Sequence, residues 1–190
     1  MCWYEYHGDG RTSQIIMQLS IHHYTQSAGW SQAPDGALDS AETVLFIFAG
    51  TRCPVLEKAL SDLRLRFSLA HWIGCSTAGE ILGAVLADDS VAVAVVRFDK
   101  ARVRSLQEKI GPENGAFEAG RNIARSLAGP ELKGIFVLAD GLAVNGSALA
   151  KGLAAELPAG LPVSGGLAAD GDRFGQTWVI ADRAPQAEHI

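Results

Sequence analysis

Apolar residues in this sequence follow two patterns. Six short runs are apolar almost throughout, which is typical of strands buried on both faces of a sheet. These runs span residues 43–50, 70–75, 90–98, 134–140, 161–166 and 176–182. Three other segments repeat their apolar residues at helical spacing and predict helices over residues 54–67, 117–127 and 145–157. Strands and helices alternate in this order, which predicts an α/β fold with a mixed, mainly buried β-sheet flanked by helices.

The middle of the chain is richer in strands than its two ends. Residues 80–86 form a further apolar segment directly before the strand at 90–98. We expect these two segments to pair in a hairpin that turns at Asp88 and Asp89.

The length of 190 residues favours a single domain. Residues 1–40 are polar, aromatic and broken by Gly and Pro. We expect an irregular N-terminal extension at 1–28, a domain at 29–182 and a tail at 183–190. Met17 resembles an ordinary start, and residues 1–16 are therefore either part of the extension or the product of a misplaced start codon.

Composition excludes several classes of protein. The net charge is −5, and no basic cluster is denser than residues 64–66, so we expect no nucleic-acid binding. Cys2, Cys53 and Cys75 are odd in number and lack metal-type spacing, which predicts free thiols, a reducing compartment and no metal site. No secretory signal is visible, and no apolar run approaches the ~20 residues of a membrane span. We expect a cytoplasmic protein without a membrane span.

Loops that follow the predicted strands are rich in small and polar residues. Strand ends in open α/β sheets form ligand crevices, glycine lets the backbone approach a ligand, and free N–H groups suit anions. The loops lie at residues 49–52, 74–80, 139–146 and 164–174. If they share one edge of the sheet, they form a polar pocket.

The segment GCSTAGE, residues 74–80, also invites a catalytic interpretation through Cys75. A cysteine nucleophile needs a base nearby, and His71 would lie roughly 13 Å away on the same strand. No G-x-S-x-G motif is present. We therefore predict no enzyme activity, with a Cys75-dependent enzyme as the alternative.

Three segments together resemble the N-terminal half of the FIST domain family. They are GCSTAGEI at 74–81, LADGLAVNGSAL at 138–149 and LPVSGGLAADGDRFGQTWV at 161–179, and the segment LDSAETVLFIFAG at 38–50 also fits. The resemblance covers residues 29–182 in order and spacing.

This resemblance implies a bacterial-type sensory domain of intracellular signal transduction that binds a small ligand, with amino acids as the proposed class. It implies partners such as a histidine kinase or a cyclic-dinucleotide enzyme. We expect no cofactor; the alternative is a haem-binding nitric-oxide sensor, because some members of the family bind haem.

One departure from the family concerns the second half of the FIST domain, which is expected after the strand at 176–182. The sequence ends at Ile190. We expect either a half-domain that works with a separate FIST C-terminal half, or a remnant that binds nothing.

The candidate site combines the strand-end loops with the segments that carry the resemblance. Backbone N–H groups from Cys75 to Gly79 would hold a carboxylate, and Glu80, Asp140 and Asp170 would meet a cationic group or orient the loops. A turn at Asp140 and a solvent-facing Glu80 are the simpler alternatives. The predicted ligand-binding residues are Cys75, Ser76, Thr77, Ala78, Gly79, Glu80, Asp140, Gly141, Asn145, Gly165, Gly166 and Asp170.

Overall fold

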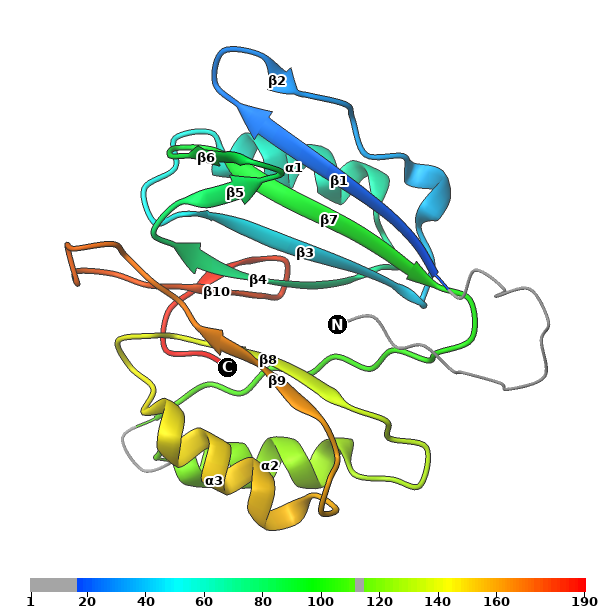
Figure 1. Cartoon of the computed structure of the whole chain (residues 1–190), viewed down its shortest axis with the longest axis vertical. Coiled ribbons are helices and arrows are strands. Elements are labelled where there is room, and N and C mark those ends of the chain that lie inside the picture. Colours follow the sequence, from blue (N-terminus) through cyan, green and yellow to red (C-terminus); the bar gives the residue numbers. More distant parts are fainter. Residues whose placement is uncertain (1–16, 112–114) are drawn as a thin grey trace.

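The computed structural model describes residues 17–111 and 115–190, which fold into the strands and helices labelled in Figure 1. The strands are β1 (Met17–Thr25), β2 (Gly29–Trp30), β3 (Thr43–Gly50), β4 (His71–Thr77), β5 (Glu80–Leu82), β6 (Val85–Ala87), β7 (Val91–Phe98), β8 (Ile135–Ala139), β9 (Val163–Leu167), β10 (Val179–Ala181) and β11 (Ala184–Gln186). The helices are α1 (Leu56–Arg66), α2 (Ala116–Leu127) and α3 (Gly146–Glu156), with one 3₁₀ turn at Gly36–Leu38.

A seven-stranded sheet forms the larger part of the fold. Its strand order is β11-β10-β4-β3-β7-β1-β2, with β3 and β4 parallel and the other neighbours antiparallel. Strands β5 and β6 form a separate antiparallel pair, and β8 and β9 a separate parallel pair. The mixed sheet with helices confirms the predicted α/β class.

Helix α1 covers one face of the large sheet, as Figure 1 shows. Leu60 and Leu63 of α1 are fully buried, and they belong to the same core as Leu45 and Ile47 of β3. Burying a side chain of this size stabilises a fold by about 1.5–3 kcal/mol. The opposite face carries exposed apolar residues on β1, among them Ile21 at 60%.

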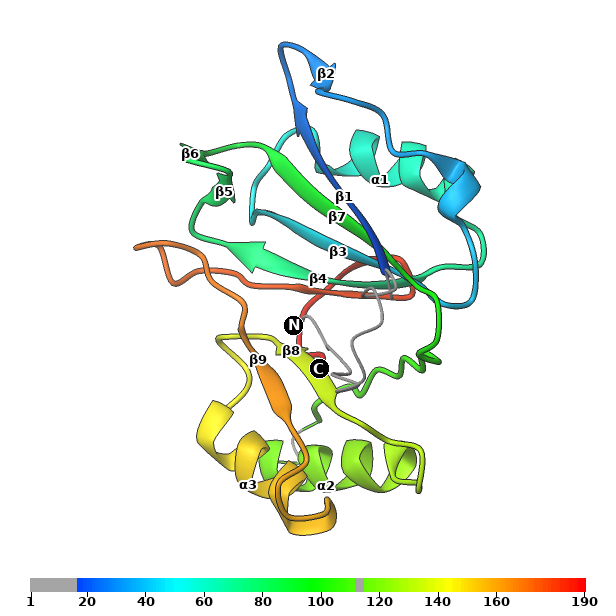
Figure 2. The same cartoon turned by 45° about the vertical axis from the view of Figure 1, so that its right-hand side comes forward.

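The second layer consists of β8 and β9 with helices α2 and α3. Figures 1 and 2 both show the two strands lying between the large sheet and the two helices. Leu138 of β8 packs with Cys75 and Val179 of the large sheet. The rings of Phe46 and Phe136 meet edge to face at a centroid distance of 5.4 Å. These contacts hold the second layer against β4 and β3.

The structure corrects the expected pairing of residues 80–86. Strand β5 pairs with β6, and the hairpin turns at Gly83 and Ala84 rather than at Asp88 and Asp89. Pairing with β7 is blocked because β3 and β1 already occupy both of its edges.

Regular structure also begins earlier and ends later than expected. Residues 17–25, predicted to be irregular, form β1 and pair with β7 along almost its whole length. Residues 184–186 of the expected tail form β11, and Ile190 is buried. Residues 1–16 lie outside the described part of the chain. Within that part, no helix has the length and apolar character needed to cross a membrane.

Close packing of α2 on α3 gives a testable consequence. A Cβ atom on Gly152 would lie 2.0 Å from the carbonyl oxygen of Phe117, which is far inside van der Waals contact. We expect Gly152→Ala to lower the free energy of unfolding by about 1–3 kcal/mol, as overpacking does. Gly129→Ala is the control, because a Cβ there meets no atom within 4 Å. Equal urea midpoints for the two variants would contradict this packing.

Candidate functional site

A hollow of about 350 Å³ opens at the carboxyl ends of β3 and β4. On one side it is bounded by the β5–β6 hairpin, and on the other by the loop between β9 and β10. Both elements project from the same side of the molecule in Figures 1 and 2. The lining residues are Gly50, Thr77, Ala78, Gly79, Glu80, Asp88, Asp89, Gly171, Asp172 and Arg173. We call this the acidic hollow; its volume suits a small molecule.

Glu80 places a buried carboxylate in the acidic hollow. The residue is 2% exposed. Its Oε1 accepts a hydrogen bond of 2.6 Å from the Thr77 hydroxyl, and its Oε2 accepts one of 2.9 Å from the Ser90 hydroxyl. Within residues 17–111 and 115–190, no cation and no backbone N–H contacts this carboxylate. A carboxylate has about four acceptor sites, so Glu80 can accept further donors.

Asp170 has a different environment, although it is just as buried. Its Oδ1 accepts hydrogen bonds from the Thr51 hydroxyl and from Arg173 Nε, and its Oδ2 accepts from the N–H groups of Gly175 and Gln176. The Thr51 bond lowers the pKa of Asp170 most, and with the others it outweighs burial and holds the pKa well below its usual range. These five residues, the Asp170 cluster, fix the loop that walls the hollow.

Asp140 is also satisfied by the protein itself. Its Oδ1 accepts from the Thr177 hydroxyl and from the N–H groups of Leu142 and Ala143, and its Oδ2 accepts from Glu188 N–H at 2.7 Å. Burial acts to raise the pKa of Asp140, but these hydrogen bonds together lower it. The carboxylate thereby shapes its own turn and ties it to the end of the chain.

Cys75 and Ser76 are enclosed in the sheet. Burial raises the pKa of the Cys75 thiol to about 11, so the thiol is neutral near pH 7. Ser76 N–H donates to the Trp178 carbonyl at 2.9 Å, and the Ser76 hydroxyl accepts from Trp178 N–H. This N–H group is therefore not available to a ligand carboxylate. Cys53 and Cys75 are free thiols, as expected, and Cys2 lies outside the described residues.

Of the remaining predicted site residues, two line the acidic hollow and four do not. Ala78 and Gly79 line the acidic hollow. Asn145 caps α3 by accepting a hydrogen bond from Ala148 N–H. The residues Gly141, Gly165 and Gly166 do not line the hollow: Gly141 lies against the Ala168 carbonyl, and the other two belong to β9.

Sequence reasoning missed most of the charge in the hollow. Asp88, Asp89, Asp172 and Arg173 all line it. Asp88 and Asp89 were interpreted as a hairpin turn and were therefore not considered as residues of the site that contains Glu80. Their place directly before a buried strand was the signal that could have identified them.

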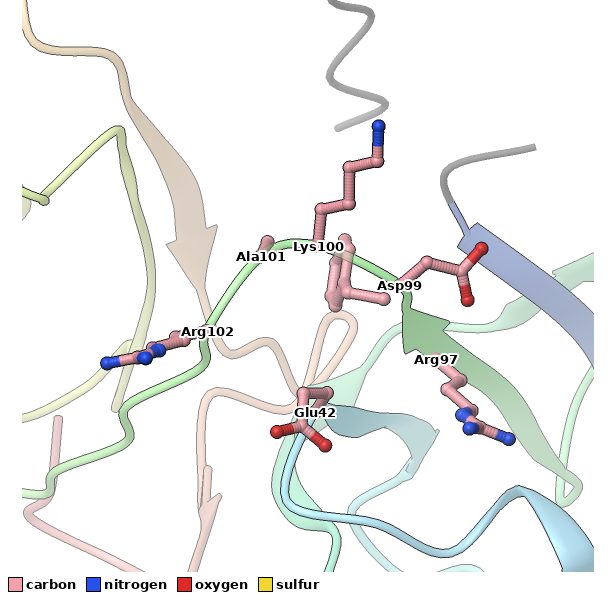
Figure 3. Close-up of a pocket in the computed structure, with 7 residues that line it drawn as sticks. Glu42, Arg97, Asp99, Lys100, Ala101 and Arg102 are labelled. Carbon is pink, nitrogen blue, oxygen red and sulfur yellow. The ribbon is translucent and has the colours of Figure 1, made fainter. Parts of the chain in front are cut away.

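A second hollow, of about 300 Å³, lies at the end of β7 near the start of β3. It is lined by Glu42, Arg97, Phe98, Asp99, Lys100, Ala101 and Arg102. Figure 3 shows the charged groups of Arg97, Lys100 and Arg102 pointing in different directions. They do not converge on one point, so this hollow lacks the geometry of a site for a single charged group.

Two histidines that could serve a haem are already engaged, whereas Nε2 of His23 is buried without a hydrogen-bond partner among the described residues. Both ring nitrogens of His22 are hydrogen-bonded, to Ser20 and to the Gln32 carbonyl. Those of His71 are bonded to Ser105 and to the Ala41 carbonyl. Within the described ranges, no group of three or more His, Cys, Asp or Glu side chains could hold a metal ion.

The fold and the site define an α/β module with an acidic hollow at its strand ends. A family model described as FIST N domain matches residues 43–190, well over half of the chain, and the chain belongs to this family. FIST N domains are sensory domains of signal transduction. No curated protein and no solved structure matches the chain. The resemblance seen in the sequence is thereby confirmed.

The environment of Asp140 predicts a pH dependence of stability. Because its pKa is lowered by folding, it stabilises the fold above the unfolded value of about 3.9, and this contribution is lost as the pH falls further. We expect Asp140→Asn to cost about 1–3 kcal/mol near pH 7, since its NH₂ faces N–H donors. The difference from wild type should shrink towards pH 2. Exposed Asp182→Asn, the control, should change stability by less than about 0.5 kcal/mol; an equal loss there would contradict the assignment.

Burial of Cys75 predicts slow alkylation. A thiol with a raised pKa carries little thiolate, the reactive form, at neutral pH. We expect iodoacetamide to modify Cys75 in the folded protein at pH 7.5 at least about tenfold more slowly than in urea. Peptide mass spectrometry identifies the residue. Fast labelling of Cys75 in the folded state would contradict this prediction and support the alternative of a Cys75-dependent enzyme.

Proposed function

We propose that this chain is the ligand-binding part of a signalling protein, and that its ligand occupies the acidic hollow. The proposal rests on the position and the hydrogen bonds of Glu80. It is buried, it lines the hollow, and its described partners are two hydroxyl groups. Buried carboxylates are normally matched by stronger donors. A cationic group of a ligand would supply that missing partner.

The other charges of the hollow support an amino acid as the ligand. Asp88, Asp89 and Asp172 add negative potential around Glu80 and favour an ammonium group. Arg173 uses Nε and Nη2 for Asp170 and Thr51, while its Nη1 has no partner within the described part of the chain. That nitrogen can donate to a carboxylate. A zwitterionic amino acid satisfies both groups.

Residues of the segment before Glu80 complete the proposed contacts. Thr77, Ala78 and Gly79 line the same hollow, and we keep them as ligand contacts from the predicted set. Asp140 and Asp170 act in this proposal by orienting the loops, because their acceptor sites are filled by the protein. The ligand is bound and not converted.

Signalling requires that the ligand favour one of two conformations with different affinity for a partner. We propose a histidine kinase, a cyclic-dinucleotide enzyme or a separate FIST C-terminal half as that partner. Each of these partners would have to contact a surface whose shape depends on occupancy of the hollow.

A thermal-shift screen against the twenty standard amino acids and haem tests this function. A ligand present at 100 times its Kd adds about 2.7 kcal/mol of stability and raises the Tm. We expect at least one amino acid to raise the Tm. Glu80→Gln should weaken its binding roughly ten- to hundredfold, as loss of a charge-assisted hydrogen bond does.

Glu42→Gln is the matched control, because Glu42 lines the second hollow and not the acidic one. It should bind like wild type. Cooperative melting of both variants shows that they fold. If no amino acid raises the Tm of the wild-type protein, the ligand class is wrong, and a Soret band after haem addition would support the haem sensor instead.

A further inference from the structure

The β5–β6 hairpin is weakly attached to the rest of the protein. Its two strands pair with each other and join no other strand. Among the described residues, no backbone hydrogen bond links residues 80–87 to another element. Its polar attachment is the carboxylate of Glu80, which binds the hydroxyls of Thr77 and Ser90 at the base of the hairpin.

Large apolar side chains stand exposed on both sides of the acidic hollow. On the hairpin, Ile81 is 75% and Leu86 70% exposed, and they are cross-strand partners on one face. On the opposite side, Phe174 is 75% exposed in the loop between β9 and β10. Leu86 reaches the edge of the hollow, because a Cβ added to Gly79 would lie 3.1 Å from its Cδ1.

The two sides of the hollow differ in how firmly they are held. The loop that carries Phe174 is fixed at its base by the Asp170 cluster. The hairpin instead leaves the sheet through Gly79, with φ +148°, and returns through Asp89, with φ +54°. Hinges are typically a few loop or element-terminal residues that absorb large changes in φ and ψ, and Gly79 and Asp89 stand at the two ends of the hairpin.

We propose that the β5–β6 hairpin is a lid that rotates about Gly79 and Asp89 and closes the acidic hollow, bringing Ile81 and Leu86 against Phe174. This inference rests on the proposed function for the identity of the ligand, but not for the movement itself. Closure removes three exposed apolar side chains from water, which favours the closed state.

Glu80 couples the lid to the ligand because it is the first residue of the hairpin and also the proposed ligand contact. A cation can bind at the acceptor sites of this carboxylate that Thr77 and Ser90 leave unused. A ligand held there contacts both the hairpin and the opposite wall of the hollow only when the hairpin is closed. Ligand binding therefore shifts the population towards closure, as a differential affinity for two states requires.

Disulfide trapping tests the lid. In a Cys2→Ser background, the pair Leu86→Cys and Phe174→Cys can join when the Cβ atoms approach to about 3.5–4.5 Å. The exposure of both wild-type side chains means that they do not pack together in the present structure. We expect mild oxidation to cross-link this pair at least tenfold faster than the control pair Leu19→Cys and Phe174→Cys. Peptide mass spectrometry identifies the bond.

The same twenty amino acids are then added during oxidation. An amino acid that raises the Tm should accelerate cross-linking several-fold, and that result supports both proposals. Fast cross-linking with no effect of any amino acid on rate or Tm supports the lid and overturns the ligand class. Cross-linking no faster than the control, in a pair that melts cooperatively, overturns the lid. The ligand proposal then stands if an amino acid still raises the Tm.

Discussion

Satisfaction of the Asp170 carboxylate is the constraint on which the functional end of this molecule depends. A buried carboxylate must find donors, and Asp170 takes them from the loop after β3 and from its own loop after β9. These bonds join segments separated by 119 residues in sequence. They fix one wall of the acidic hollow and orient Arg173 beside it.

Three buried acidic residues at strand ends show that residue type alone does not determine whether a carboxylate is available to a ligand. Asp140 and Asp170 accept from backbone N–H groups and hydroxyls until their acceptor sites are filled. Glu80 receives two hydroxyls and faces the hollow. The difference arises from tertiary structure, because the donors to Asp140 and Asp170 include residues brought near by folding. A ligand-binding role is therefore argued for Glu80 and not for the other two.

The elements that could be predicted are those whose pattern is local. The strands β3, β4, β7 and β8 and the three helices follow from continuous apolar runs and helical spacing. Strand β1 was not predicted, because polar residues such as Ser20 and His22 interrupt its apolar run. The predicted pairing of β5 with β7 was wrong, because both edges of β7 are paired with other strands. The segment from Thr77 to Glu80 that lines the hollow was among the predicted residues, but Arg173 and the three aspartates that also line it were recognised only from the fold.

The position of the last strands has a consequence for how the protein is made. Ser76 is bonded to Trp178 across 102 residues, and β10 completes the sheet beside β4. During synthesis, the first strands must remain without these partners until β10 has left the ribosome. Contacts of such long range slow folding, because loop closure must precede them. The nascent chain thus exposes the edge of β4 until β10 is made, a period in which chaperone binding would protect it from aggregation.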